Sequence, residues 1–113
     1  MTVLAQVLDQ PAILWARSGT GADGQPAYAA PSAIVSHWDE GTEEVLTPGG
    51  ERRRSVATAL VSADAAPGSM VVRGTLGGGT SADPRDEAAL EVLVAERWTV
   101  PLTGEVMRRL KLG

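Results

Sequence analysis

The stretch EEVLTPGGERRRS, residues 43–55, joins an acidic arm to a basic arm through a Pro-Gly-Gly segment. Such a segment favours a tight turn, because proline presets its φ angle and glycine accepts the positive φ that many turns need. The stretch is flanked on both sides by runs with the alternating pattern of β-strands, at residues 33–40 and 54–63. The sequence therefore predicts a long charged β-hairpin loop, residues 41–54, which projects beyond the core. We call this segment the charged hairpin.

Length and composition limit the size of that core. A chain of 113 residues supports a single domain, residues 1–113, because one core of this size already uses most of the apolar side chains. Hydrophobic residues make up 43% of the chain, but many are alanines, and aromatic bulk comes from three tryptophans and one tyrosine. We expect a thin core, and such domains often gain stability by assembling with copies or partners.

Charge and residue types argue against several classes of function. The net charge of −4 disfavours general affinity for nucleic acid or for anionic membrane surfaces. The absence of cysteine excludes disulfides, thiol catalysis and zinc-thiolate sites. No basic signal-peptide segment opens the chain, and no apolar run approaches the ~20 residues that span a bilayer. We expect a soluble protein with no membrane partner.

The first half of the chain predicts short elements separated by turns. Residues 1–10 place apolar side chains at helical spacing, which favours a short N-terminal helix limited by Pro11. The apolar run 12–17 predicts a strand, and the glycine-rich segment 18–26 predicts a turn. Residues 33–40 alternate as a further strand.

The second half continues this pattern. Residues 54–63 predict a strand with one face of small side chains, and Pro67-Gly68 suits the centre of a type II turn. Residues 70–76 and 105–113 predict two more strands. Five or six short strands separated by turn signals indicate a small antiparallel β-barrel or sandwich.

Residues 83–98 fit two structures equally well. Asp83 followed by a proline is a good helix start, and the apolar residues from Leu90 to Val94 include helical spacings. The same apolar residues also alternate as they would in a strand. Pattern alone therefore leaves helix and strand open.

Few residues suggest chemistry. His37, the single histidine, lies in a predicted strand, where a surface role is far commoner than a catalytic one. The glycine cluster at residues 74–81 lacks the lysine of a phosphate-binding loop. Asp83, Asp86 and Glu87 lack the ligand spacing of a calcium loop. We predict no enzyme, no metal site and no cofactor; the enzymatic alternative is a small hydrolase that uses His37 with a nearby acid.

The charged side chains of the hairpin are the candidate site for contacts with a neighbouring subunit or a channel: Glu43, Glu44, Glu51, Arg52, Arg53 and Arg54. Opposite charges across paired strands contribute only ~0.2–1 kcal/mol per pair, so they do not hold the hairpin rigid by themselves. Arginine forms bidentate pairs with carboxylates, which suits binding to another chain, whereas the nearby acidic residues offset attraction to DNA phosphates. A solvated surface loop is the alternative. We expect the hairpin to contribute little within its own subunit.

The order of these features resembles the small head-tail joining proteins of tailed bacteriophages, the neck or head-closure (stopper) family. Three pieces carry most of the resemblance: WDEGTEEVLTPGGE (38–51), ADAAPGSMVVRG (63–74), and the Asp83-Pro84 segment leading to a strand and a Leu-Thr-Gly turn. The similarity in order runs along most of the chain. The chain departs from the family in having no aromatic residue in the hairpin and an alanine-rich core.

The resemblance implies a small β-barrel or sandwich that assembles as a homo-oligomeric ring, with a helical turn at residues 84–87 followed by a strand. It implies a structural virion protein, made in the host cytoplasm, that joins the portal or adaptor of the head to the tail and helps close the DNA channel. Tail-terminator or tail-tube proteins, and transiently DNA, are the further partners. The alternative is a tail-completion or tail-terminator ring whose hairpin grips a tail tube.

Overall fold

Strands dominate the part of the chain that the structure describes. The structure is a computed structural model, and it describes residues 8, 10–22, 24–99, 101 and 104–113. Its elements are β1 (Gln10–Trp15), β2 (Arg17–Thr20), β3 (Pro26–Tyr28), β4 (Ser32–Leu46), β5 (Arg52–Val61), β6 (Met70–Arg73), the 3-10 turn η1 (Pro84–Glu87), β7 (Leu90–Thr99) and β8 (Val106–Leu112). The mainly β prediction is confirmed.

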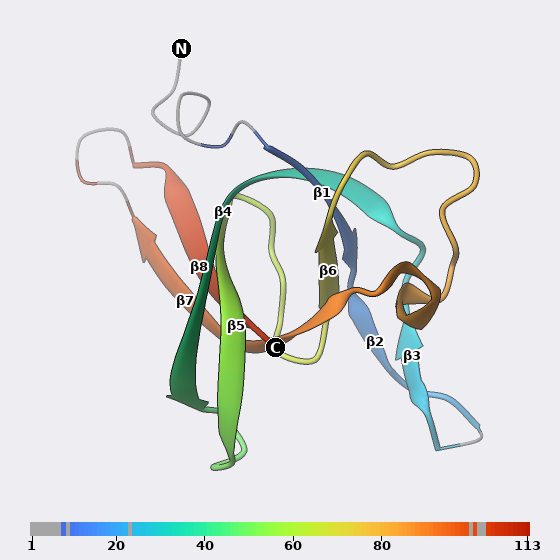
Figure 1. The fold of residues 1–113 in the computed structure, drawn as a ribbon, viewed down its shortest axis with the longest axis horizontal. Helices are drawn as coiled ribbons and strands as arrows, with labels where there is room; N and C mark the ends of the chain where they lie inside the picture. The colour runs from blue at the N-terminus through green and yellow to red at the C-terminus, as the bar shows by residue number, and fades with distance from the viewer. Residues whose placement is uncertain (1–7, 9, 23, 100, 102–103) are drawn as a thin grey trace.

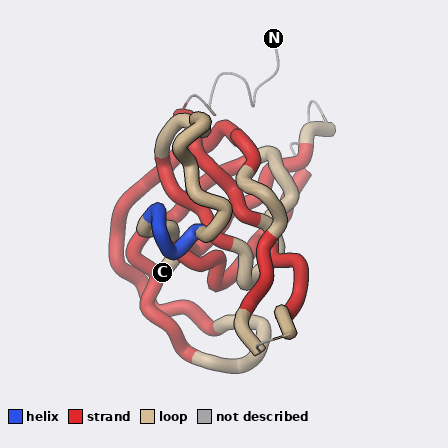
Figure 2. Tube along the Cα trace, turned by 90° about the vertical axis from the view of Figure 1, so that its right-hand side faces the viewer, coloured by secondary structure: helices blue, strands red, loops and turns tan. Residues whose placement is uncertain are grey.

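Six of these strands close into an antiparallel barrel (Figure 1). Their order is β1-β4-β5-β8-β7-β6, and β6 pairs with β1 to complete the ring, while β2 and β3 form a separate two-stranded sheet. Figure 2 shows that strands make up the body of the molecule and that loops gather at its ends. The structure is thus the barrel of the two predicted architectures, and closure satisfies the sheet edges that a sandwich leaves open.

The interior of the barrel is filled by apolar side chains from every barrel strand. Strand alternation places the predicted small-residue face of β5 inside, where Ala57 and Ala59 are 2% and 0% exposed. Ala59 pairs with Trp38 of β4, so a small side chain stands beside a large one. This alternation of small and large side chains lets Trp38 lie in the interior of so small a barrel.

Strand β1 is buried on both of its faces. Ala12 and Leu14 belong to the interior cluster, yet Ile13 and Trp15 are also buried. The indole Nε1 of Trp15 donates a hydrogen bond to the carbonyl of Ser81 at 3.1 Å. The loop between β6 and η1 therefore covers the outer face of β1.

Two predictions for the shorter elements need correction, and a third, the N-terminal helix at residues 1–10, lies mostly outside the described residues. Gln10, the last residue of that predicted helix, begins β1. The predicted turn at 18–26 is a small hairpin, because β2 and β3 pair across a turn in which the Gly21 N–H donates to Gln25 O at 2.7 Å. Strand β6 ends at Arg73, since Gly74 has a φ of 142.

The ambiguous segment 83–98 is a single 3-10 turn followed by a strand, so the strand alternative is right for Leu90 to Val94 and the helical alternative is wrong there. Asp83 caps η1, and Ala88, at φ 55, ends it in the left-handed conformation. The chain then extends as β7, as the resemblance implied. The type II turn is also confirmed: the Ser69 N–H donates to Ala66 O at 3.1 Å, and Gly68 has a φ of 94.

Candidate functional site

The charged hairpin is a continuation of two barrel strands. Strands β4 and β5 stay paired out to Leu46 and Arg52, beyond which Thr47 to Glu51 form the turn. The Gly50 N–H donates to Thr47 O at 2.9 Å, and Gly50 has a φ of 87. This arrangement fits a three-residue hairpin loop with proline at its first position. Figure 1 shows the hairpin extending beyond one end of the barrel, so the predicted hairpin is confirmed as a structural element.

A bulge separates the hairpin from the barrel part of the same strands. The register shifts between Glu40, which pairs with Ala57, and Glu43, which pairs with Ser55. One extra residue on β4 reverses which side chains face inward. As a result Trp38 is buried before the bulge and Val45 is buried after it.

The base of the hairpin packs against its own subunit, which corrects the expectation that it contributes little there. Val45 is 9% exposed, and Lys111 Nζ lies 3.1 Å from a carboxylate oxygen of Glu43, with the lysine side chain 13% exposed. The backbone of Gly113 lies so close to the Arg54 carbonyl that a side chain on Gly113 would collide with it. Residues near the bulge therefore belong to the folded body.

The remaining predicted site residues lie on the exposed part of the hairpin. Arg52 Nη1 lies 3.4 Å from Glu44 Oε1, across the two strands, and both side chains are largely exposed. Glu51, Arg53 and Arg54 are exposed as well, and none of the three forms an ion pair with another described residue. The structure brings the six predicted residues onto one hairpin, but only Glu43, Glu44 and Arg52 form ion pairs, Glu43 with Lys111 and the other two with each other.

Sequence reasoning overlooked Leu46 as part of this site. Its side chain is 64% exposed, more than the other exposed large apolar residues of the described chain, Val35 and Val56. Leu46 lies at the end of β4, where the body no longer covers the strand. A single leucine beside a turn, within an otherwise charged segment, is the sequence signal that could have identified it as an exposed apolar residue.

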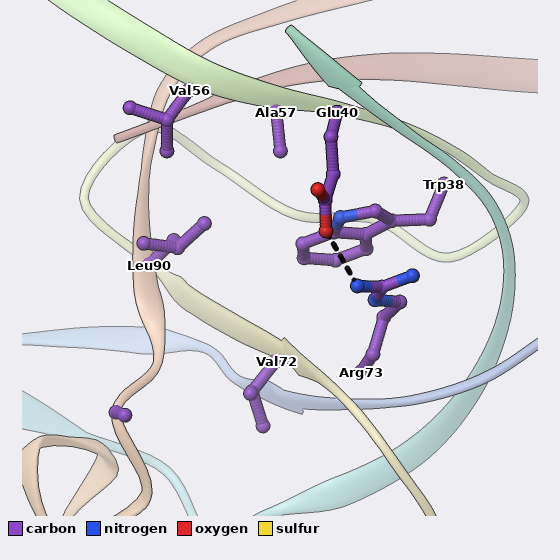
Figure 3. A pocket seen from close by; sticks show the side chains of 8 residues that line it. Trp38, Glu40, Val56, Ala57, Val72, Arg73 and Leu90 are labelled. Carbon is purple, nitrogen blue, oxygen red and sulfur yellow. Dashed lines mark hydrogen bonds and ion pairs between the residues drawn. The ribbon is translucent and has the colours of Figure 1, made fainter.

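A pocket of about 500 Å³ opens at the end of the barrel where the hairpin begins (Figure 3). Arg73 of β6 is the centre of its polar wall: Nη2 donates to Glu40 Oε1 at 2.7 Å, and the guanidinium carbon lies 5.5 Å from the centroid of the Trp38 ring. Such cation-aromatic stacking is favourable when the ring is nearly buried, as Trp38 is. We call this the barrel-end pocket, and it is lined by Trp38, Glu40, Val56, Ala57, Val72, Arg73, Ala88 and Leu90.

His37 has a carboxylate neighbour on the outside of β4. Its Nε2 lies 3.7 Å from Asp39 Oδ2, and the two side chains are 44% and 74% exposed. Asp39 is the single partner recorded for His37 within the described residues. The pair gives the hydrolase alternative an acid beside its histidine, but the hydroxyl nucleophile that a triad needs is not hydrogen-bonded to it.

The acidic turn η1 uses its carboxylates for its own structure. Asp83 accepts hydrogen bonds from the Nε and backbone N–H of Arg85, each at 3.0 Å, and these bonds lower the pKa of Asp83. Asp86 and Glu87 both bond Ser81, through its hydroxyl and its N–H, each at 2.8 Å. Over the described ranges of the chain, no group of three or more His, Cys, Asp or Glu side chains is arranged to hold a metal ion.

Comparison with known proteins yields no relative: no protein-family model matches the chain, and no curated protein is significantly similar to it. Within the described residues, no helix has the length and apolar character needed to cross a membrane.

Proposed function

We propose that this chain is a structural subunit of the neck of a tailed bacteriophage, where copies form a ring between the portal or adaptor and the tail. The observation that supports this most is the charged hairpin. It leaves a small closed barrel and presents Arg53 and Arg54, which have no ion-pair partner among the described residues. The proposal also rests on the resemblance in the order of sequence features.

Closure of the barrel makes the hairpin the natural element for association. Each barrel strand has a paired neighbour on both sides, so the barrel closes without an edge strand, although β7 pairs with β6 at only two positions. The hairpin, by contrast, carries guanidinium groups without an ion-pair partner among the described residues, and an exposed leucine at its tip, which the core does not cover. A two-stranded ribbon is marginally stable in water by itself, so contacts with another subunit would stabilise it.

The charge of the subunit suits a channel through which DNA passes. A net charge of −4 opposes tight phosphate binding, while the arginines of the hairpin can still contact DNA or a neighbouring carboxylate. We place the protein in the virion after its synthesis in the host cytoplasm, with portal or adaptor and tail proteins as its partners.

Removal of the chain from a phage that encodes it tests this function. Electron microscopy of the lysate should show DNA-filled heads and separate finished tails, and adding the purified chain should restore joined particles. Complete infectious particles without the chain would contradict the proposal. Joined particles with tails of irregular length would contradict it too and would favour the tail-terminator alternative.

A further inference from the structure

One face of the charged hairpin combines an apolar side chain with an unmatched positive charge. Directly paired residues of antiparallel strands share a face, and every second residue of a strand returns to it. The pairs Leu46–Arg52 and Glu44–Arg54 therefore share one face. Arg52 is paired with Glu44, which leaves Leu46 and Arg54 as the groups without a partner on that face within the described chain.

The barrel-end pocket has the complementary properties. Its walls include the aliphatic residues Val56, Val72 and Leu90, which come from three different strands (Figure 3). Its volume of about 500 Å³ lies within the range of roughly 300–1,000 Å³ typical of binding pockets. An open pocket with these walls accepts a leucine side chain.

The charges that line the pocket balance each other, and the turn next to it carries an excess of carboxylates. Arg73 is the one basic residue among those that line it, and Glu40 already neutralises this arginine. The chain next to the lining residue Ala88 carries two more carboxylates, Asp86 and Glu87. Arg85 of the same turn is paired with Asp83, and Asp86 and Glu87 are hydrogen-bonded to Ser81 without an ion pair to another described residue, so a guanidinium beside the pocket can pair with them.

The tip of the hairpin in the same subunit does not reach this pocket. Leu46 lies six residues beyond Glu40 on β4, which corresponds to about 20 Å along a strand. Pairing with β5 keeps the chain between Glu40 and Leu46 extended, because the two strands stay paired over this segment except at the bulge. Leu46 can therefore enter such a pocket only in a second copy.

We infer that the charged hairpin of one copy docks into the barrel-end pocket of the next, with Leu46 in the pocket and Arg54 against the carboxylates near Ala88. The two surfaces differ, so the contact is head-to-tail and propagates from copy to copy until a ring closes. This inference rests on the proposed function, since it supplies the contact between copies that the ring requires.

Cysteine trapping tests the contact directly, because the chain contains no cysteine of its own. In a variant with Leu46→Cys and Val56→Cys, the two positions of one copy are separated by at least four residues of strand, about 13 Å. A disulfide requires Cα atoms within about 7 Å, so a bond between them forms between copies only. Oxidation, or a short bismaleimide, should give a ladder of linked multimers in a denaturing gel.

A matched pair places the second cysteine at Ala22, an exposed residue in the turn between β2 and β3. The variant with Leu46→Cys and Ala22→Cys should give at least tenfold less linked product. Equal linkage in the two variants would overturn the inference. The inference would also be overturned if native mass spectrometry showed assembled protein in which position 46 does not link to position 56. The proposed ring would then form through a different contact. A chain that stays monomeric and restores no joining of heads to tails would overturn both.

Single substitutions give a second, independent readout. Leu46→Ser should weaken self-association about tenfold, because the buried leucine loses its apolar contact, and Val35→Ser should not, although Val35 is 47% exposed. Arg54→Glu should weaken association by about the same factor, and Arg97→Glu, an equal change of charge on exposed β7, should have little effect. If the Val35 or Arg97 variant weakened self-association and the Leu46 and Arg54 variants did not, the proposed contact would be contradicted.

Discussion

Gly49 and Gly50 are neighbours in the hairpin turn, but only Gly50 has a backbone angle that requires glycine. Its φ is 87, whereas a side chain on Gly49 meets ordinary contact with Thr47 Oγ1 at 3.9 Å. A left-handed conformation costs an alanine about 1 kcal/mol. Gly50→Ala should therefore speed hydrogen exchange of the Thr47 amide, which donates to Glu51 O, about fivefold, as measured by NMR. Gly49→Ala is the matched control, and equal rates in the two variants would show that the turn has another conformation.

Asp83 gives a pH-dependent prediction at the same scale. The side-chain hydrogen bond from Arg85 lowers the pKa of Asp83 most, and the backbone hydrogen bond from Arg85 adds to this effect. A lowered folded-state pKa means that the ionised cap stabilises η1 above the ordinary aspartate pKa, and that this contribution is lost as the pH falls through the folded value. NMR titration of the Asp83 carboxyl carbon should give a midpoint below the usual 3.8.

Arg85→Ala separates the two causes of that shift. The variant removes the side-chain hydrogen bond and leaves the backbone N–H, so the Asp83 midpoint should rise part of the way to its ordinary value. Arg52→Ala, on the distant hairpin, should leave it unchanged. A midpoint that does not move in Arg85→Ala would exclude Arg85 as the main cause.

At the scale of elements, the small-residue face of β5 makes room for Trp38 in the interior of the barrel. Ala59 is fully buried between its partners Trp38 on β4 and Leu110 on β8. A larger side chain there has no free volume, so Ala59→Leu should lower the free energy of unfolding by about 1–3 kcal/mol, measured by tryptophan fluorescence in urea. Thr58→Leu, on the half-exposed outer face, should change it by less than about 1 kcal/mol. Similar losses in both variants would place the alanine face outside the core.

Alternation along the chain was enough to predict β4, β5 and β8, because each of these strands has one face on the core and one toward water. It failed at β7, where a bulge between Val92 and Val94 buries Val92 and Leu93 in succession and breaks the period. It also predicted a turn where β2 and β3 pair, since both strands are short and polar or half-exposed, and carry no apolar signal.

The barrel-end pocket lay beyond any local pattern. Arg73 reaches Glu40 across 33 positions of sequence, and this contact exists because barrel closure brings β6 close to β4 through β1. The charged hairpin is the opposite case. Its turn and its two strands are consecutive in the sequence, so the hairpin could be predicted. The burial of Val45 could not, because it depends on a bulge for which the sequence gives no signal.

At the scale of the whole molecule, the charged hairpin divides into a base that stabilises the barrel and a tip that does not. The base includes Val45, the Glu43–Lys111 ion pair and the close contact of Gly113 with the Arg54 carbonyl. Beyond Val45, residues 46 and 48–52 are exposed and Thr47 is half-buried. A variant that removes only the tip should therefore keep the fold and lose the interactions proposed for the hairpin.

Replacing residues 46–52 with Asn-Gly joins Val45 to Arg53, which already pair across the strands, through a favoured two-residue turn. The free energy of unfolding should change by less than about 1 kcal/mol, because no fully buried side chain is lost. Deletion of residues 43–53 should instead destabilise the barrel by about 1–3 kcal/mol, since it also removes Val45 and the partner of Lys111. Both variants should be monomeric by native mass spectrometry where the full chain assembles. If the shorter replacement still assembled, the tip would not be the contact between copies, and if it unfolded as readily as the longer deletion, the division into base and tip would be wrong.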